Sequence, residues 1–299
     1  MFFYRHFYYK MNFKKMKNIL VTGATGQLGS ELKILSVNYP QYRWIFADRT
    51  QVSLGDTMLL KEQLAVIQAD IILNCGAYTA VDKAESEREL ADVVNHQAVA
   101  VMAAYAKEHD VKLIHVSTDY VFDGTSSTAL KEDAVTNPIN VYGASKRAGE
   151  LAALSVNPDV VIIRTSWVYS RFGNNFVKTM QRLLYERDTL GVVNDQIGSP
   201  TYAADLAQAM MDIVSNENWI PGIYNYSNEG EISWCEFVLA IQEIIGEQCE
   251  VKGIPSSAYP TPAVRPAYSL LDKTKIKEVY GVAVPYYKES LRKCLKFKV

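Results

Sequence analysis

Short apolar runs alternate with helical patterns along the first half of the chain. Runs of mainly aliphatic residues predict five strands, at residues 18–22, 44–47, 71–75, 113–117 and 160–164. Apolar residues at helical spacing predict helices at residues 27–35, 57–67, 90–109 and 141–154, the second capped by Asp56 or Thr57. Strands that are apolar throughout are buried on both faces, so the alternation predicts an α/β fold with a doubly wound, Rossmann-type parallel sheet. Such a sheet binds ligands at the carboxyl ends of its strands.

The alternation loosens after residue 168, where a second region begins. Helical patterns at residues 175–186, 203–214 and 234–245, with proline-containing loops between 253 and 266, predict a smaller α/β lobe interleaved with the first. We expect a dinucleotide-binding domain at residues 17–168, to which segments around 190–225 return, and a substrate-binding lobe at residues 169–189 and 226–299. Residues 1–16 are aromatic and basic without an uninterrupted apolar run, so we interpret them as an extension outside the fold and not as a signal peptide.

Composition narrows the partners that the chain could have. Its 31 basic and 33 acidic residues give a formal net charge of -2, which gives no reason to expect nucleic acid or a membrane as partner. The four cysteines form no C-x-x-C pair and there are only four histidines, so no metal is expected. Unpaired thiols favour a cytoplasmic protein, and no apolar run approaches the ~20 residues that a membrane-spanning helix needs.

A glycine-rich loop follows the first predicted strand. Gly23, Gly26 and Gly29 form the pattern G-x-x-G-x-x-G between that strand and the first predicted helix. Glycines permit a tight turn and a close approach of the backbone to a pyrophosphate, while the helix supplies unbonded N–H groups and the positive end of its dipole. The loop therefore predicts a bound nicotinamide dinucleotide, with the backbone groups of Gln27 and Leu28 beside the pyrophosphate.

Two adjacent residues at the end of the second predicted strand bear on the choice between NADPH and NADH. Asp48 lies about 20 residues past the glycines, where a carboxylate can accept hydrogen bonds from the ribose hydroxyls of NADH. Arg49 follows it, and an arginine at this place can instead hold the 2′-phosphate of NADPH. The two residues point to different cofactors, so the sequence leaves both open.

Tyr142 and Lys146 are four residues apart on one predicted helix and therefore share a face. An ammonium beside a phenol stabilises the phenolate, so we expect Lys146 to lower the pKa of Tyr142 and to make the pair a proton relay. Thr118 follows the fourth predicted strand, at the edge of the sheet where substrates bind. Its hydroxyl can stabilise charge that develops on a substrate carbonyl oxygen.

Seven motifs, in order along residues 17–295, give the chain a resemblance to a known family. They are T-G-A-T-G-Q-L-G (22–29), A-Y-T-A-V-D-K-A-E (77–85), S-T-D-Y-V-F-D-G (117–124), N-V-Y-G-A-S-K (140–146), R-T-S-W-V-Y (164–169), N-N-F-V-K-T-M (174–180) and N-D-Q-I-G-S-P-T (194–201). The chain resembles the dTDP-4-dehydrorhamnose reductases, which belong to the extended short-chain dehydrogenase/reductase superfamily. The resemblance implies reduction, with NADPH or NADH, of the C4 carbonyl of dTDP-4-dehydro-L-rhamnose to dTDP-L-rhamnose, a precursor of cell-surface polysaccharides.

The resemblance also implies roles for individual residues. Tyr142 would donate the proton to the C4 oxygen, Lys146 would bind the nicotinamide ribose, and Thr118 would stabilise the oxyanion in place of a serine. On the substrate side, Asp119 would hold a sugar hydroxyl, Trp167 would lie against the sugar, and Asn175 would fix the nucleotide. The loop that passes along the cofactor would be Ala77, Tyr78 and Thr79.

Three positions depart from the family pattern or leave it ambiguous. Ser53, followed by Leu54, stands beside the adenine where relatives often carry an aspartate. Some relatives dimerise through Mg²⁺ held by glutamates; Glu31 matches one such position, but Ala204 stands where another glutamate is expected, so no metal is carried over. Arg265 would pair with a substrate phosphate or lie in a solvated loop, and both interpretations remain open.

Two other functions compete with the reductase. One is another nucleotide-sugar epimerase, dehydratase or reductase of the same superfamily, although Tyr120 disfavours a dehydratase, which would carry an Asp-Glu pair at this place. The other is a regulatory subunit that binds the cofactor without catalysis, against which the intact Thr118, Tyr142 and Lys146 argue. The expected partner is a small nucleotide sugar, and the chain is expected to be a monomer or a homodimer.

Overall fold

The computed structural model describes residues 16–296 of the chain, and residues 1–15 of the expected extension lie outside the described residues. Its centre is a six-stranded sheet in the order β10-β5-β4-β3-β1-β2, in which all neighbouring strands are parallel. The strands are β1 (Lys17–Thr22), β2 (Tyr42–Ala47), β3 (Ile71–Asn74), β4 (Lys112–Thr118), β5 (Val161–Thr165) and β10 (Gly222–Asn225). The predicted α/β fold with a parallel sheet is confirmed, and β10 is a sixth strand that the sequence pattern does not predict.

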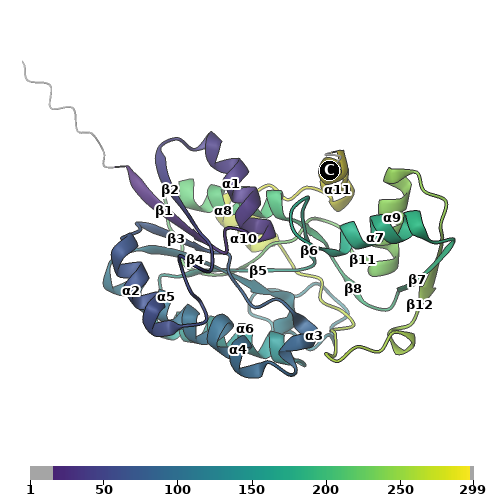
Figure 1. Cartoon of the computed structure of the whole chain (residues 1–299), viewed down its shortest axis with the longest axis horizontal. Helices are drawn as coiled ribbons and strands as arrows, with labels where there is room; N and C mark the ends of the chain where they lie inside the picture. The colour runs from purple at the N-terminus through teal and green to yellow at the C-terminus, as the bar shows by residue number, and fades with distance from the viewer. Residues whose placement is uncertain (1–15, 297–299) are drawn as a thin grey trace, which may run out of the picture.

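Helices cover both faces of this sheet (Figure 1). On one face α1 (Gln27–Leu35), α8 (Ala203–Ser215) and α10 (Thr274–Tyr280) bury their apolar side chains against the strands. On the other face α2 (Thr57–Ile67), α5 (Ala98–Glu108) and α6 (Val141–Val156) do the same. Successive residues of a strand point to opposite faces, so strands as apolar as these need a helical layer on each side.

The region predicted as one helix at residues 90–109 is interrupted. It consists of α4 (Arg88–Asp92), a π-helical turn (Val93–Gln97) and α5, and it follows the short α3 (Val81–Ala84). The backbone of the π turn packs closely against α6. A Cβ atom at Gly149 of α6 would lie only 2.1 Å from the carbonyl oxygen of Asn95. The π turn also directs the Asn95 amide toward Tyr78, whose backbone N–H and C=O it binds at 2.9 and 3.0 Å. Such π turns are frequent beside functional sites.

A second, smaller lobe packs beside the carboxyl ends of the strands (Figure 1). Its helices are α7 (Phe176–Glu186), α9 (Trp234–Ile245) and α11 (Tyr287–Lys296). Its strands form three pairs: β7 (Thr189–Val193) with β12 (Glu250–Ile254), β8 (Ile197–Gly198) with β11 (Ile232–Ser233), and β6 (Val168–Tyr169) with β9 (Thr201–Tyr202). A separate apolar cluster, which includes Val177, Phe237 and Leu291, forms its core.

The last part of the chain contributes to both lobes. Ile276, Tyr280 and Val282 are buried in the same apolar cluster as the residues of the central strands. We therefore propose that residues 274–284 belong with the dinucleotide-binding domain, and not with the substrate lobe to which the sequence pattern assigns them. The reason is that α10 has no partner in the second lobe's core, whereas it packs directly against β10.

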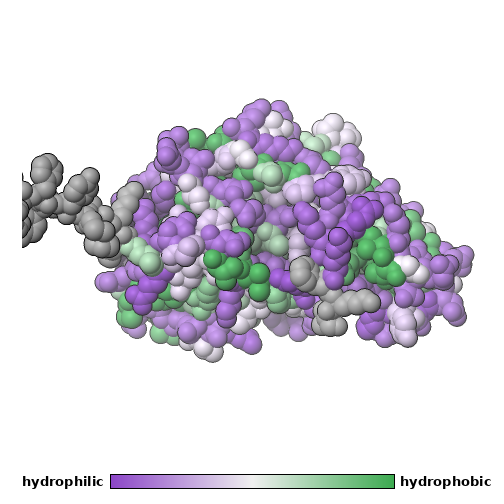
Figure 2. All heavy atoms as spheres, turned by 90° about the horizontal axis from the view of Figure 1, so that it is seen from above, coloured by the Kyte–Doolittle hydropathy of each residue, from purple (hydrophilic) through white to green (hydrophobic). Residues whose placement is uncertain are grey.

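In Figure 2 hydrophobic groups on the displayed face are small and separated by hydrophilic ones. None of the helices between residues 16 and 296 is long and apolar enough to cross a bilayer.

Candidate active site

A cleft of about 1040 Å³ lies at the carboxyl ends of the central strands, between the two lobes. Its volume is at the upper end of the range for small-molecule sites. Most of the site residues expected from the sequence line it: Gly23, Gly26, Gln27, Leu28, Arg49, Ser53, Leu54, Ala77, Tyr78, Thr79, Thr118, Asp119, Tyr142, Lys146, Trp167 and Asn175. Three expected residues, Gly29, Asp48 and Arg265, are not part of the lining.

The glycine loop lies where the strand order reverses, between β1 and β3. Gly23 has φ +64, and a Cβ atom there would be 2.7 Å from the backbone of Gly76. A Cβ atom at Gly29 would be 2.4 Å from the carbonyl oxygen of Gly23, so Gly29 serves the packing of the loop and not the lining of the cleft. Helix α1 begins after Gly26 without a capping side chain, so its first N–H groups remain available for a ligand. These residues fit the pyrophosphate of a dinucleotide.

At the adenine end of the cleft, the structure separates Asp48 from Arg49. The Asp48 carboxylate accepts hydrogen bonds from the hydroxyl of Thr50 at 2.6 Å and from its backbone N–H at 2.8 Å. These hydrogen bonds, with one from Gln51, lower the pKa of Asp48. Arg49 instead lines the cleft. All of these hydrogen bonds go to Oδ1 of Asp48, and a contact between this carboxylate and a ribose stays a prediction.

Helix α6 brings Tyr142 close to the end of β4. Its N-cap is Asn140, whose side chain accepts from the N–H of Gly143 at 2.7 Å. A Cβ atom at Gly143 would lie 2.1 Å from the carbonyl oxygen of Tyr120, so only glycine permits this approach. The ring of Tyr142 lies edge-on to that of Tyr120, with centroids 5.7 Å apart. The segment that carries Thr118 and the helix that carries Tyr142 thus face the same part of the cleft.

The electrostatics of the Tyr142–Lys146 pair differ from the expectation. Burial raises the pKa of Tyr142 to about 12, although a hydrogen bond with Thr118 lowers it in part. Burial also lowers the pKa of Lys146 to about 8. The Lys146 Nζ donates to the carbonyl oxygen of Val116 at 2.6 Å and lies 3.3 Å from Nε2 of His115. The structure therefore does not show the expected lowering of the Tyr142 pKa by Lys146: burial raises this pKa, and the hydrogen bond with Thr118 opposes the rise.

Asp119 connects the two lobes at the floor of the cleft. Its side chain is buried and accepts from the hydroxyl of Ser269 at 2.6 Å and from that of Thr118 at 3.1 Å. Burial raises its pKa to about 6, against the lowering effect of these two hydrogen bonds. The carboxylate therefore orients the Thr118 hydroxyl, in addition to lining the cleft.

Trp167 has an unusual backbone and an aromatic partner. Its φ of +47 is in the left-handed region, which a bulky residue adopts only when its surroundings hold it there. The indole stacks on Trp234 with centroids 3.6 Å apart and an interplanar angle of 13°. A Cβ atom at Gly198 would approach the Trp167 ring to 3.0 Å, so glycine makes room for it. Both indoles line the cleft.

Asn175 joins the substrate lobe to the glycine loop. The side-chain oxygen Oδ1 caps α7 by accepting from the backbone N–H of Lys178 at 3.1 Å. The side-chain Nδ2 donates to Oε1 of Gln27 at 3.0 Å. The amide also donates to the carbonyl oxygen of Ser170 at 2.6 Å. Asn175 lines the cleft as expected, but its polar atoms already have partners within the protein.

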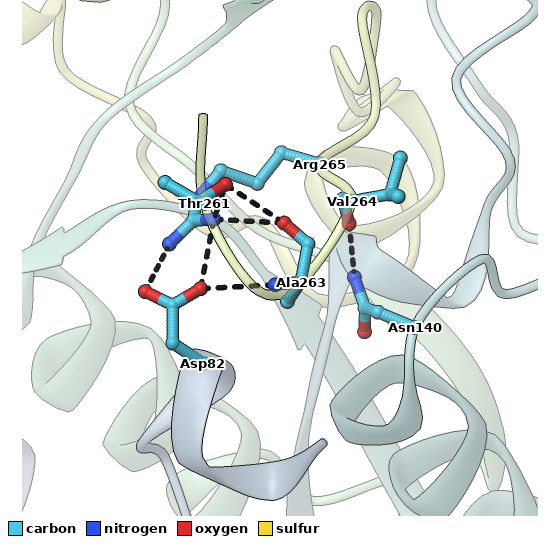
Figure 3. A network of polar contacts seen from close by, with 6 residues as sticks. All are labelled: Asp82, Asn140, Thr261, Ala263, Val264 and Arg265. Carbon is cyan, nitrogen blue, oxygen red and sulfur yellow. Dashed lines mark hydrogen bonds and ion pairs between the residues drawn. The ribbon is translucent and has the colours of Figure 1, made fainter. Parts of the chain in front are cut away.

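Arg265 is bound to a carboxylate of the other lobe (Figure 3). Its guanidinium makes a two-pronged contact with Asp82 of α3, with N–O distances of 3.0 and 2.9 Å. It also donates to the hydroxyl of Thr261 at 2.6 Å, and Asn140 donates to the adjacent carbonyl of Val264 at 2.7 Å. The loop at 261–265 is thereby tied to α3 and to the start of α6. Arg265 therefore lies outside the cleft lining, in a loop in which Pro262 and Val264 are exposed, and its contact with a substrate phosphate stays a prediction.

The residue that matches a family metal position has other partners here. Glu31 is buried and accepts from the hydroxyl of Ser170 at 2.6 Å, and burial raises its pKa. Within residues 16–296, no group of three or more His, Cys, Asp and Glu side chains is placed to hold a metal ion.

Sequence reasoning missed three residues at or behind the cleft. Gly76 follows the third predicted strand and packs against Gly23, and a glycine directly after a buried strand was a usable signal. Trp234 stacks on Trp167 across a sequence distance that no local pattern shows. His115 is fully buried and lies beside Lys146.

Comparison with known proteins gives a consistent result. The family model described as "RmlD substrate binding domain" matches residues 16–298. A dTDP-4-dehydrorhamnose reductase of Aggregatibacter actinomycetemcomitans is 39% identical over 287 residues, which cover 93% of this chain and 98% of that protein. One of Sinorhizobium fredii is 42% identical over 284 residues, covering 92% and 95%. The crystal structure of dTDP-4-dehydrorhamnose reductase from Bacillus anthracis in complex with NADP has a TM-score of 0.89 at 36% identity, covering 94% of this chain and 99% of that one.

Proposed function

The chain belongs to the RmlD substrate binding domain family, and we propose from this membership that it reduces the C4 carbonyl of dTDP-4-dehydro-L-rhamnose, yielding dTDP-L-rhamnose, with NADPH or NADH. One observation carries the proposal: a single cleft contains both the glycine loop and the side chains of Thr118, Tyr142 and Lys146. A cofactor site beside a hydroxyl, a phenol and a lysine is suited to carbonyl reduction.

The residues of the chain supply binding, orientation and protons. When bound, the reduced nicotinamide supplies the hydride that reduces the carbonyl. Tyr142 holds its proton at neutral pH, since burial raises its pKa to about 12, and it donates that proton to the C4 oxygen. The Thr118 hydroxyl donates to Asp119 in this structure, and it stabilises negative charge on the same oxygen when its proton turns from Asp119 to the substrate. Lys146 orients the nicotinamide ribose and returns a proton to Tyr142.

The sugar and the nucleotide are proposed to bind between the lobes. Trp167 offers the face of its indole to the sugar, and Asp119 accepts from a sugar hydroxyl. Asn175 lies at the boundary between the glycine loop and α7, where it supports the nucleotide part. Arg265 reaches the diphosphate only by leaving Asp82, because both prongs of its guanidinium are engaged there.

The location and partners of the chain are proposed from its cysteines and its net charge. The four cysteines are free thiols, which fits a reducing cytoplasm. The net charge of -2 provides no excess of positive charge that would attract nucleic acid, so the proposed partner is the nucleotide sugar. The chain is proposed to act as a monomer or a homodimer without a bridging metal.

The proposal is tested by following the absorbance of the reduced nicotinamide. The 4-dehydrorhamnose substrate is generated in the same cuvette from its dTDP-sugar precursor, and the product is identified by mass spectrometry. We expect oxidation of NADPH or NADH that depends on the substrate, with one dTDP-L-rhamnose formed per cofactor oxidised. Isomerisation of the sugar without net oxidation would favour an epimerase, and cofactor binding without turnover would favour a regulatory subunit.

A further inference from the structure

A row of buried polar side chains crosses the central sheet and ends at Lys146. The backbone N–H of Gly76 donates to the Thr22 hydroxyl at 3.2 Å, and this hydroxyl donates to Oδ1 of Asn74 at 2.6 Å. Nδ2 of Asn74 lies 2.9 Å from Nδ1 of His115. Nε2 of the same ring lies 3.3 Å from Nζ of Lys146. The row thus connects the turn beside the glycine loop to the catalytic lysine.

The register of the sheet creates this row. Thr22 of β1 is paired with Asn74 of β3, and Asn74 is paired with His115 of β4. Residues at the same register point to the same face of a parallel sheet, so the three side chains lie next to one another. All three are at most 1% exposed, as is Lys146. A buried polar group needs a partner, and here each side chain of the row supplies one to the next.

The hydrogen bonds have a direction that fixes the histidine tautomer. The Thr22 oxygen accepts from Gly76, so its own proton is free to go to the carbonyl oxygen of the Asn74 amide. The Asn74 amide then presents an N–H to Nδ1 of His115, which must accept. Burial and the charge of Lys146 hold the pKa of His115 well below its usual range, so the ring is neutral and carries its one proton on Nε2.

We propose that the Thr22–Asn74–His115 row keeps an Nε2–H group pointed at Lys146, and that His115 is thereby a positioning residue favouring the form of Lys146 that has given a proton to Tyr142. An N–H group beside an ammonium repels it, whereas beside a neutral amine it donates a hydrogen bond to the nitrogen lone pair. The inference rests on the proposed function, since it assigns His115 a part in the same proton transfer.

The proton balance of the step is simple. Tyr142 gives its proton to the C4 oxygen, and the phenolate takes one from the Lys146 ammonium. The resulting amine accepts from His115 Nε2–H and still donates to the carbonyl of Val116. A proton from solvent then restores the ammonium, and His115 keeps its own proton throughout.

Other ionisable groups face Lys146 and act on it as well. Burial is the largest influence on its pKa, and Glu150 on the same helix opposes it. The Glu150 carboxylate is itself shared with Arg164 of β5 and with Arg147. Around the pair, the ionisable side chains on α6, on the turn after β4 and on β4 are Tyr142, Glu150, Asp119, Tyr120 and His115. Of these groups, His115 is the one whose ring nitrogen lies 3.3 Å from the amine.

The tautomer can be measured directly on the unmodified protein. Nuclear magnetic resonance of protein labelled with ¹⁵N-histidine distinguishes Nε2–H, Nδ1–H and imidazolium forms, and loss of one signal set in His115→Gln assigns it among the four histidines. We expect the Nε2–H form from about pH 5 to about pH 9 without cofactor or substrate. An Nδ1–H ring, or an imidazolium that titrates within this range, contradicts the proposal whatever the enzyme's substrate proves to be.

A pair of matched variants tests the effect on the lysine. Thr22→Val removes the hydroxyl that orients Asn74, so the amide can turn and the ring can offer a lone pair to the ammonium. We expect the basic limb of the kcat–pH profile to move to higher pH, by about half a unit. Thr201→Val removes one buried threonine hydrogen bond outside the row and should leave the limb in place. An unmoved limb in Thr22→Val, or equal shifts in both variants, would assign the row a structural role only.

Discussion

At the scale of single residues, the buried phenol of Tyr142 already carries its proton, and is therefore neutral, before any substrate binds. Its pKa of about 12 keeps it protonated near neutral pH. The pKa of Lys146 is about 8, so this ammonium releases its proton more readily than that of an exposed lysine would. A protonated phenol suits a site that must donate to a developing alkoxide.

Tyr142→Phe tests this role. The substitution removes only the hydroxyl, so we expect kcat to fall by a factor of about 10² to 10⁴, while the dissociation constant for NADPH changes little. Tyr105→Phe removes the hydroxyl of another largely buried tyrosine, outside the cleft lining, and should keep normal turnover. We would measure kcat and the dissociation constant for NADPH in both variants. A near-normal kcat in Tyr142→Phe would refute the assignment of Tyr142 as proton donor.

Arg49→Ala tests the choice of cofactor. Arg49 lines the cleft, whereas Asp48 does not and its Oδ1 is engaged with Thr50, so a 2′-phosphate would find a cation there. We expect KM for NADPH to rise by about tenfold, which corresponds to the loss of one charged hydrogen bond, and KM for NADH to stay within about twofold. The control is Arg43→Ala, at an exposed position of β2. Equal effects on both cofactors would mean that Arg49 does not recognise the phosphate.

At the scale of elements, a buried ion pair fastens α6 to the sheet. The Glu150 carboxylate accepts from Arg164 of β5 at 2.9 and 2.8 Å, and both side chains are at most 1% exposed. Arg164 also donates to the carbonyl oxygen of Glu132 at 3.0 Å. The helix that carries Tyr142 and Lys146 is therefore held in place from its middle, one turn after the lysine.

Glu150→Gln should destabilise the fold strongly. It leaves the Arg164 charge buried without a counter-charge, which costs about 3 to 5 kcal/mol in the free energy of unfolding. Burial alone would raise the pKa of Glu150, but Arg164 holds it below the ordinary value of 4.5. The stabilisation from this lowered pKa is present above about pH 4.5 and is lost as pH falls through the folded-state value, so the variant should show a smaller loss of stability in acid.

The comparison for this measurement is Glu186→Gln. Glu186 pairs with Arg182 at 2.6 Å on the surface of α7, where both side chains are about half exposed. Exposed pairs of this kind contribute about 0.5 kcal/mol or less. Urea unfolding of both variants between about pH 3 and pH 7 tests the difference, and a similar loss in the two would show that the buried pair does not anchor α6.

The elements that the sequence predicts well are those with local signals. The helix at 27–35 follows its glycine loop, and α2 begins after Asp56, whose side chain caps it as the sequence indicates. The π turn depends on Gly149, far along the chain, and β10 is too short for its apolar pattern to be distinctive. Among the site residues, the partner of Arg265 lies 183 positions away, so no spacing argument could find Asp82.

At the scale of the whole molecule, a few polar contacts hold the lobes around the cleft. Asn175 reaches Gln27, Ser269 reaches Asp119, and Arg265 reaches Asp82. Each of these contacts involves a residue that lines the cleft or lies next to one that does. A ligand that enters the cleft therefore meets the same side chains that join the lobes.

Asp82→Asn tests the contact that lies outside the lining. The Asp82 side chain is 40% exposed, so we expect a loss of only about 1 kcal/mol in overall stability, since exposed ion pairs contribute little. The local effect should be larger, with faster amide hydrogen exchange at residues 259–267, because the loop loses its attachment to α3. Asp159→Asn, which removes a distant surface pair with Lys107, should leave this exchange unchanged. Unaltered exchange in Asp82→Asn would show that the loop is held by other contacts.

The stacked indoles of Trp167 and Trp234 also have an optical consequence. Two indoles whose centroids lie 3.6 Å apart couple their excited states, and this coupling changes their absorption and circular dichroism. The other two tryptophans, Trp44 and Trp219, lie outside the cleft lining and add a constant background. A sugar that settles on Trp167 would alter this coupling. If the sugar binds against Trp167 as proposed, these bands would report its binding without a label, also in variants that no longer turn over.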